Sequence, residues 1–382
     1  MSGSLSLPAL VRVAVVLVVS GATPLLAACG DDDQGDDRSG ASVVGGDESG
    51  EDRNPDDDET DWSEFAVEPL SAPAREDVAL PEPAERVTCP APTISVGDSA
   101  SLEAALADAQ PGDVIGLAAG TYDGNFVATA EATAEAPIHL CGPTDAVLAG
   151  EGPEESGYVL HLDGADHWRL VGFTVRDGRK GVMVDAGAGN VIQALNVTHI
   201  GDEAIHLRSH STDNLVLDNE VSDTGIRRDK FGEGVYIGSA ESNWCEYTGC
   251  EPDRSDDNRI EGNHISGVTS EAIDIKEGTV DGVVLDNVID GAAIAAADSW
   301  IDVKGNSWVV AGNRLEHGPE HGIQTHEIIQ GWGSGNAFID NVLNLDADGF
   351  GFDMHGPEAT NLVACDNEVV GAGDGFANED CR

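Results

Sequence analysis

Basic residues are scarce in this sequence. Of 382 residues, 19 are Lys or Arg and 71 are Asp or Glu, so the formal net charge is -52 at neutral pH. Such an excess of negative charge opposes the binding of nucleic acids and other polyanions by bulk attraction. We therefore expect no nucleic-acid partner, and an acidic ligand would need a local group of basic residues or a bridging cation.

Aromatic residues are also few, at 5% of the chain, whereas 47 residues are glycine. This composition argues against a globular helical protein and favours a turn-rich repeat. The length allows one large domain with appendages, and we expect a monomer.

The apolar run near the N-terminus, Val13 to Val19, is too short for a membrane-spanning helix. Arg12 precedes it, and Leu26-Ala27-Ala28-Cys29 follows, a tetrad that resembles the bacterial lipobox. We expect residues 1–28 to be a lipoprotein signal peptide and Cys29 to be lipidated. The protein would then be exported and held at the cell envelope only through this lipid. An ordinary secretory signal is the alternative.

Residues 29–86 contain almost no clustered apolar residues and include the acidic runs DDDQGDD and PDDDETD. A segment of this kind buries too little surface to offset its ordering entropy, so the sequence predicts an acidic, disordered tether. Residues 87–382 remain for the folded domain.

Seven cysteines are an odd number, and lipidation of Cys29 would leave six. Their spacing suggests three local disulfides in an oxidising compartment. The expected pairs are Cys89 with Cys141, Cys245 with Cys250, and Cys365 with Cys381.

Asparagines recur at intervals of about one solenoid turn from residue 196 onward. Each precedes an apolar strand position, and one longer interval holds an insertion at about residues 226–254. Asparagine tolerates left-handed backbone and can stack its side-chain amides in ladders. The series is Asn196, Asn219, Asn263, Asn287, Asn313, Asn341 and Asn367.

A second periodic series consists of short strands in which apolar and polar residues alternate, such as AIDIK (272–276) and WIDVK (300–304). Alternation of this kind places the apolar side chains inside and the polar side chains outside. Aligning the strands predicts an outward face that carries His206, Arg208, Tyr236, Asp274, Lys276, Asp302, Lys304, Gln324 and His326, with Glu233 and Glu271 just upstream.

These residue types suit the β-elimination of a uronate polymer. The reaction needs the sugar carboxylate to be neutralised by a divalent cation or by Arg and Lys, a base for the adjacent proton, and an acid for the leaving oxygen. We assign Lys276 as the base and Lys304 or His326 as the acid. Arg208 would bind a substrate carboxylate, and His206, Tyr236 and Gln324 would contact the sugars.

From about residue 95 the chain resembles the pectin-lyase-like superfamily of right-handed parallel β-helices. The segment SLEAALADA (101–109), the following PGD turn, an apolar strand and GTY resemble the N-terminal cap of these enzymes. The resemblance implies an all-β, three-sided solenoid with a short capping helix.

The nearest resemblance is to the chondroitinase-B and alginate-lyase type. There a strand of the form E-x-I-x-x-K carries a calcium-binding glutamate and the lysine base, and EAIDIK supplies Glu271 and Lys276. The resemblance implies a Ca²⁺ site at Glu271, with Asn258 near it, and we add Asp274, Asp302 and Glu233 as candidate ligands. The family's Arg-His-Gly acid is replaced here by Lys304-Gly305.

The sequence therefore predicts an extracytoplasmic polysaccharide lyase that acts on an acidic, uronate-containing polysaccharide. Two alternatives stay open. One is a non-catalytic cell-surface β-helix that binds glycan or serves as a structural module, and the other is a uronate epimerase or glycoside hydrolase on the same fold, because fold alone does not decide function.

Overall fold

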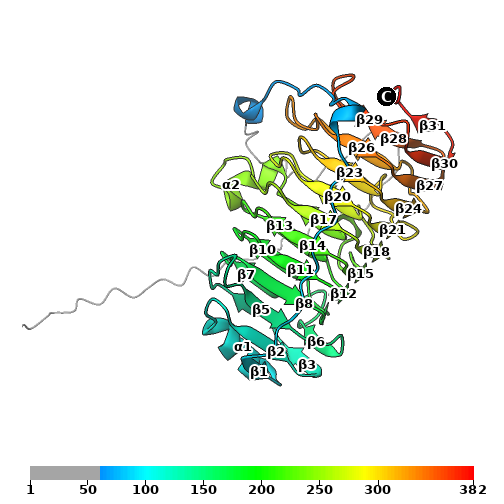
Figure 1. Ribbon diagram of the computed structural model, residues 1–382. Coiled ribbons are helices and arrows are strands. Elements are labelled where there is room, and N and C mark those ends of the chain that lie inside the picture. The colour runs from blue at the N-terminus through cyan, green and yellow to red at the C-terminus, as the bar shows by residue number, and fades with distance from the viewer. Residues whose placement is uncertain (1–60) are drawn as a thin grey trace, which may run out of the picture. The chain divides into compact units, whose positions relative to one another are not determined.

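The structure is a computed structural model that describes residues 61–382. The predicted signal peptide, Cys29 and residues 30–60 of the predicted tether lie outside these residues. The described chain winds into a right-handed parallel β-helix, as predicted, with three parallel sheets along its sides (Figure 1). No helix within residues 61–382 is long and apolar enough to cross a membrane.

Each turn of the solenoid contributes one strand to each sheet. Sheet A contains β1 (Ile94–Val96), β2 (Val114–Leu117), β5 (Ile138–Cys141), β8 (Trp168–Val171), β11 (Val191–Gln193), β14 (Leu215–Leu217), β17 (Arg259–Glu261), β20 (Val283–Leu285), β23 (Val309–Ala311), β26 (Ala337–Ile339) and β29 (Leu362–Val363). Sheet B contains β3 (Gly120–Asp123), β6 (Ala146–Ala149), β9 (Thr174–Arg176), β12 (Asn196–Thr198), β15 (Glu220–Ser222), β18 (His264–Ser266), β21 (Val288–Asp290), β24 (Arg314–Glu316), β27 (Val342–Ala347) and β30 (Glu368–Ala372).

Sheet C carries the strands that the sequence singled out. It contains β4 (Phe126–Ala128), β7 (Tyr158–Asp163), β10 (Lys180–Asp185), β13 (Ile205–Arg208), β16 (Val235–Ile237), β19 (Ile273–Ile275), β22 (Ile301–Val303), β25 (Ile323–Thr325), β28 (Phe350–Met354) and β31 (Gly375–Ala377). Ile273, Ile301 and Ile323 lie in register inside the solenoid and are fully buried. Alternating β-branched residues thus fill the core and leave every second side chain on the outer face.

Buried asparagines stack along the corner between sheets A and B, as predicted. The side-chain amide of Asn219 donates to Asn263 Oδ1, and the same bond links each asparagine to the next as far as Asn367. The prediction was wrong for Asn196, because Leu195 occupies the ladder position and Asn196 pairs with Glu220 in the neighbouring strand.

The N-terminal cap is the helix α1 (Ser99–Ala107), which begins two residues before the predicted one. Asp98 caps it by accepting a hydrogen bond from the Ser101 N–H. Leu102 and Leu106 of α1 are buried in the core, so the helix closes the apolar end of the first turns.

All three predicted disulfides are present: Cys89–Cys141, Cys245–Cys250 and Cys365–Cys381. The second lies in the segment between β16 and β17, which also carries the short helices η4 (Glu241–Asn243) and α2 (Trp244–Tyr247). The short helix η3 (Asp229–Phe231) lies just before β16.

Residues 61–93, which we call the strap, cross the outer face of sheet A from its last strands to its first (Figure 1). Arg75 pairs with Asp366 near the C-terminal end at 2.7 Å, and Arg86 pairs with Asp218 near the middle at 2.9 Å. The strap includes η1 (Trp62–Phe65) and η2 (Arg75–Asp77). Residues 61–86, which the sequence assigned to a disordered tether, are instead held on the solenoid by ion pairs, hydrogen bonds and apolar contacts, including Ala72 and Val78 on sheet A.

The start of the strap packs on two loops that follow strands of sheet C. Trp62 and Phe65 contact Trp244 of α2 edge-on, with ring centres 5.2 and 5.7 Å apart. Trp332, in the loop after β25, donates its indole N–H to Phe65 O at 3.1 Å. Gly331 has a φ of 86°, and a Cβ there would clash with Val67 O, so glycine is required where the strap passes.

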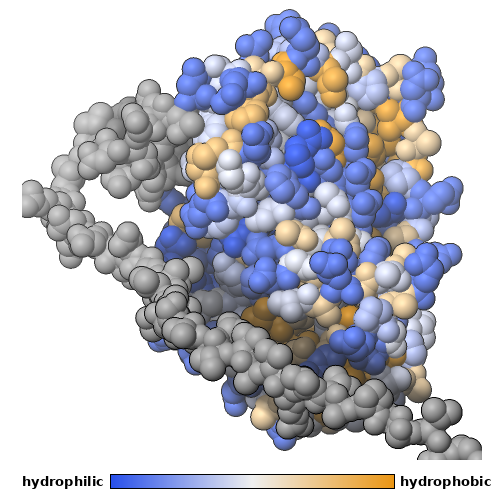
Figure 2. Space-filling model, turned by 90° about the vertical axis from the view of Figure 1, so that its left-hand side faces the viewer, coloured by the Kyte–Doolittle hydropathy of each residue, from blue (hydrophilic) through white to orange (hydrophobic). Residues whose placement is uncertain are grey.

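Hydrophilic residues cover most of the face shown in Figure 2, and hydrophobic residues are interspersed among them. The large hydrophobic side chains that are exposed come from separate parts of the described chain: Val67, Leu70, Leu80, Val127, Ile226, Val288, Ile328 and Val370.

Candidate active site

The outer face of sheet C presents three columns of residues, one per turn in each column, and nearly all of them are polar. The central column is Met183, His206, Tyr236, Asp274, Asp302, Gln324 and Asp353. The column at the ends of the strands is Asp185, Arg208, Gly238, Lys276, Lys304, His326 and His355. The column just before the strands is Lys180, Glu203, Glu233, Glu271, Ser299 and His321. The residues predicted to share one face therefore do so.

Most of these outward-pointing groups are nevertheless buried. Asp274 and Lys276 are only 2% and 8% exposed. Charged groups at such positions need partners, because removing a charge from water is costly.

A chain of ion pairs links the middle turns of this face. Asp274 lies 3.0 Å from both Lys276 and Lys304, and Lys304 also lies 2.8 Å from Asp302. Asp302 accepts a 2.9 Å contact from Nδ1 of His326. Burial disfavours the charge on Lys304, but Asp274 and Asp302 more than offset this and raise its pKa. Lys304 therefore holds its proton firmly.

The same ion-pair network shifts the pKa values of Asp302 and His326. Burial disfavours the charge on Asp302, yet His326 and Lys304 overcome it, so the pKa of Asp302 lies well below its usual range. The negative charge of Asp302 raises the pKa of His326 despite partial burial.

Three carboxylates meet beside this network. Glu233, Glu271 and Asp274 each place an oxygen within 4.8 Å of the others, and we call these residues the acidic cluster. Glu233 Oε2 is buried and has no hydrogen-bond partner in the described chain. Burial and then the charges of Glu203, Glu271 and Asp274 raise the pKa of Glu233. Burial and Asp274 likewise raise the pKa of Glu271.

The acidic cluster fits a hard divalent cation, which binds carboxylate oxygens and would relieve their mutual repulsion. Three of the five predicted metal ligands are thus brought together. Asp302 is not among the carboxylates that meet there, and it pairs with Lys304 and His326.

The prediction for Asn258 was wrong. This residue is fully buried in a second asparagine stack at the corner between sheets C and A. Its Oδ1 accepts from the backbone and side-chain amides of Asn214, and its Nδ2 donates to Ser211 O and Ser255 O. No polar atom of the side chain remains to bind a metal.

Tyr236 and His206 are neighbours in the central column, and Tyr236 also lies beside Lys276 of the next turn. The Lys276 ammonium is 5.1 Å from the centre of the Tyr236 ring, and the Tyr236 and His206 rings are 4.2 Å apart. His206 Nε2 contacts Gly238 O at 2.8 Å. Burial lowers the pKa of His206, so its imidazole is neutral at neutral pH.

Arg208 differs most from its predicted role. Its guanidinium pairs with Asp185 at 2.7 Å and donates to Tyr158 OH, and Tyr247 of α2 covers it at 3.8 Å. Its charge is therefore already balanced within the protein. Sequence alignment of the strands could have revealed Asp185, which occupies the same column one turn earlier.

Glu203 is a second residue that the sequence reasoning missed. It occupies the glutamate column with Glu233 and Glu271, and it binds Lys180 of the preceding turn at 2.8 Å. A glutamate two residues before three successive apolar strands, at positions 203, 233 and 271, was the available signal.

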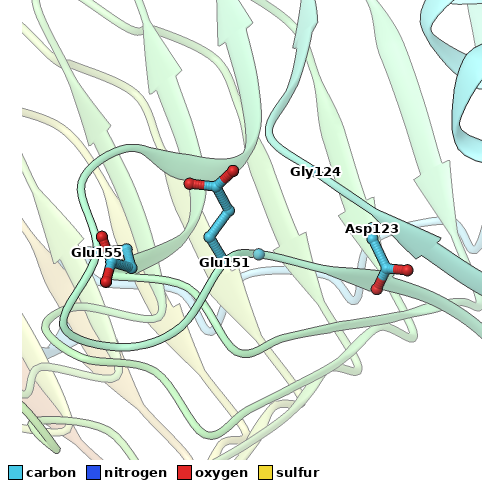
Figure 3. Close-up of a pocket in the computed structure, with 5 residues that line it drawn as sticks. Asp123, Gly124, Glu151 and Glu155 are labelled. Carbon is cyan, nitrogen blue, oxygen red and sulfur yellow. The ribbon is translucent and has the colours of Figure 1, made fainter.

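A shallow pocket of about 560 Å³ lies away from these residues, at the turns that follow β3 and β6. Asp123, Glu151 and Glu155 line it (Figure 3) together with Gly124 and Gly150. It contains none of the predicted site residues and no basic side chain.

The fold and this face define a right-handed parallel β-helix protein. A family model described as "Right handed beta helix region" matches residues 158–327. No curated protein sequence matches the chain.

Among solved structures, an alginate lyase from Paenibacillus sp. str. FPU-7 is 33% identical, with a TM-score of 0.69, over 75% of this chain and 99% of that one. The pectate lyase Pel9A is 15% identical (TM-score 0.43, 69% and 72% covered). A mannuronic acid specific family 6 lyase from human gut microbiota is 12% identical (TM-score 0.36, 72% and 82% covered). The chain belongs to the right-handed β-helix proteins of the pectin-lyase-like fold, in the family of the Paenibacillus alginate lyase.

Proposed function

We propose that this protein is a polysaccharide lyase that cleaves a uronate-containing polysaccharide by β-elimination. The observation that carries the proposal is the placement of Lys276 beside Tyr236 and the acidic cluster on one face of the solenoid. The likeness to an alginate lyase over nearly all of that enzyme supports the reaction class and makes alginate the first substrate to test.

Lys276 is the base in this proposal, as the sequence suggested. Elimination removes a proton and a leaving oxygen from neighbouring carbons, so the base and the acid must lie within a few ångströms of the same bond. Lys304, which keeps its proton, is one turn from Lys276 and disfavours a second positive charge there.

Tyr236 is the acid that fits this geometry best. It lies one turn from Lys276, whereas His326 lies two turns away, roughly 10 Å at the usual strand spacing. Lys304 is near enough, but its raised pKa makes it a poor proton donor. We therefore assign proton donation to the Tyr236 hydroxyl in place of Lys304 and His326.

The substrate carboxylate must also be neutralised. Since Arg208 is bound to Asp185, this task falls to a divalent cation, for which calcium is our candidate. Glu233, Glu271 and Asp274 would hold it, and when bound it would withdraw charge from the uronate carboxylate and so favour loss of the adjacent proton.

The arrangement of the carboxylates disfavours a glycoside hydrolase. Asp274 and Asp302 face each other in adjacent turns, but Lys304 bridges them, and hydrolysis needs a protonated acid opposite an ionised carboxylate. An epimerase would share the proton abstraction, and the products distinguish it from a lyase.

The test is to mix full-length protein with alginate, pectate and chondroitin sulfate, with calcium or with a chelator, and to follow ultraviolet absorbance. Elimination leaves a conjugated double bond that absorbs, whereas hydrolysis and epimerisation do not. We expect absorbance to rise with one polymer and to vanish in both Lys276→Ala and Tyr236→Phe, while His326→Ala keeps activity. Binding without any absorbance rise across the panel would refute the lyase and favour a glycan-binding protein.

We also propose that the protein works at the cell envelope, anchored through a lipid on Cys29. Replacement of this residue by serine should move the protein from the membrane fraction to the soluble fraction. An unchanged distribution would show that Cys29 is not the anchor.

A further inference from the structure

Glu277 carries a buried carboxyl group beside the proposed base, and the mechanism above does not use it. It follows Lys276 in the turn at the end of β19 and is 1% exposed. Its Oε1 accepts the backbone N–H of Glu241 at 2.5 Å, so its side chain reaches the loop that follows β16. This hydrogen bond joins two loops that leave sheet C from neighbouring strands.

The two loops continue from the strands that place the proposed acid and base. Tyr236 lies in β16, Lys276 comes directly after β19, and the two strands are paired. The Lys276 N–H donates to Ile237 O at 2.9 Å. Just beyond, Gly238 has a φ of 81°, and a Cβ there would lie 2.8 Å from Thr279 Cγ2, so the loops pack closely. The hydrogen bond between the loops adds to the contacts that fix how far the acid and the base lie apart.

Stability alone does not account for the Glu277 carboxyl group. Its other oxygen, Oε2, is buried and has no hydrogen-bond partner among residues 61–382. Burial raises the pKa of Glu277 to about 8, Glu241 adds to this shift, and the charges of Lys276 and Lys304 oppose it. The group is therefore mostly uncharged at neutral pH. Because a buried polar oxygen without a partner costs free energy, an apolar side chain would serve the fold better unless the carboxyl group has another task.

We propose that Glu277 is a positioning residue for the elimination, which fixes the distance between the Tyr236 hydroxyl and the Lys276 amine by accepting the Glu241 N–H. It is buried, so it acts through these residues and does not touch the substrate. The Lys276 nitrogen lies 5.1 Å from the centre of the Tyr236 ring. An acid and a base that serve the same bond tolerate little displacement, and a shift of about 1 Å can lower the rate on the order of 100-fold. This inference rests on the proposed lyase function and on the roles given to Tyr236 and Lys276.

The test measures kcat and KM separately for wild type, Glu277→Gln, Glu277→Leu and Glu277→Asp, on whichever of alginate, pectate and chondroitin sulfate is cleaved. Glutamine keeps the acceptor and, like the protonated carboxyl group, carries no charge, so kcat should stay within about threefold of wild type. Leucine has no acceptor, and aspartate is too short to reach the Glu241 N–H. Both should lose about 10- to 100-fold in kcat, while KM changes less than about threefold.

Stability is checked by urea denaturation. Leucine loses the hydrogen bond to Glu241 but also removes the unpaired oxygen, so this variant should unfold at a urea concentration close to that of wild type. If it does not fold, the aspartate variant alone decides. Glu251→Leu is the matched control, because Glu251 is an exposed glutamate in the same segment between β16 and β17, and it should keep the wild-type kcat.

The inference fails if a folded leucine or aspartate variant keeps kcat, if Glu277→Gln loses as much as they do, or if the loss appears in KM alone. Absence of cleavage by wild type would instead refute the lyase. Crystal structures of wild type and Glu277→Leu would then decide the positioning role. An increase of about 1 Å in the separation of Tyr236 and Lys276 would support it, and an unchanged separation would overturn it.

Discussion

Removal of the Lys304 ammonium should destabilise the fold strongly and in a pH-dependent way. Lys304 is buried and bridges Asp274 and Asp302, which lie in register on adjacent strands. Lys304→Met keeps roughly the length of the side chain but removes the positive charge that lies between the Asp274 and Asp302 carboxylates. Because breaking a buried pair from one side leaves an unbalanced charge, we expect the free energy of unfolding to fall by about 3 to 5 kcal/mol near neutral pH.

The pH dependence follows from the two pKa shifts. In wild type the lowered pKa of Asp302 gives stability above its unfolded value of about 3.9, and this is lost as the pH falls through the folded value. The raised pKa of Lys304 gives stability below about 10.4, which is lost as the pH rises through its folded value. Both contributions are therefore complete between about pH 5 and pH 9.

In Lys304→Met the Asp302 carboxylate loses this cation, so its pKa should rise, and its protonation then relieves the repulsion from Asp274. The deficit relative to wild type should shrink between about pH 8 and pH 5. Urea denaturation at about pH 5 and about pH 8 measures this deficit in the free energy of unfolding. Lys230→Met, at an exposed residue of η3, is the control. A deficit below about 1 kcal/mol, or one that is equal at both pH values, would refute this account of the ion-pair network.

Three further predictions concern the ladder, the strap and the acidic cluster. Asn313→Ala should lower the free energy of unfolding by about 2 to 4 kcal/mol in urea denaturation, because its fully buried amide bonds two neighbouring asparagines; a loss below about 1 kcal/mol would contradict it. Phe65→Ala should cost about 1 to 2 kcal/mol in thermal denaturation through lost packing on α2, whereas Leu80→Ala, at a 48% exposed residue, should cost much less; equal losses would argue against the strap contact. Glu271→Gln should weaken calcium binding in titration calorimetry at least tenfold, and unchanged affinity would exclude the acidic cluster as the metal site.

The sequence predicted the features of the fold that depend on local repetition. The alternation in AIDIK and WIDVK places Asp274 and Asp302 outside in register, because side-chain direction in a strand changes with every residue. The same alternation predicted that Lys276, Lys304 and His326 lie in one column. Asn196 shows the limit of this reasoning. It has the expected spacing from the next asparagine to within one residue, but that one residue places it in the strand and not in the asparagine ladder.

Partners contributed by other turns could not be predicted in the same way. Arg208 looked available for a substrate carboxylate, but Asp185 and Tyr247 engage it from the preceding turn and from the insertion. Asn258 was assigned to the metal by resemblance, whereas its amide is fully used in a buried stack. The strap was missed because its apolar contacts come from isolated residues such as Phe65 and Val78, and its ion pairs and hydrogen bonds leave no periodic pattern in the sequence.

The strap also bears on how this repeat protein unfolds. In an ordinary solenoid each turn contacts only its neighbours, so the end turns can fray while the middle stays folded. Here one continuous segment is joined to Asp366 near the C-terminal end and, through a disulfide, to Cys141 near the N-terminal end. Fraying of the last turns must therefore also break their contacts with the strap, and we expect the turns to unfold more cooperatively than a series of independent repeats.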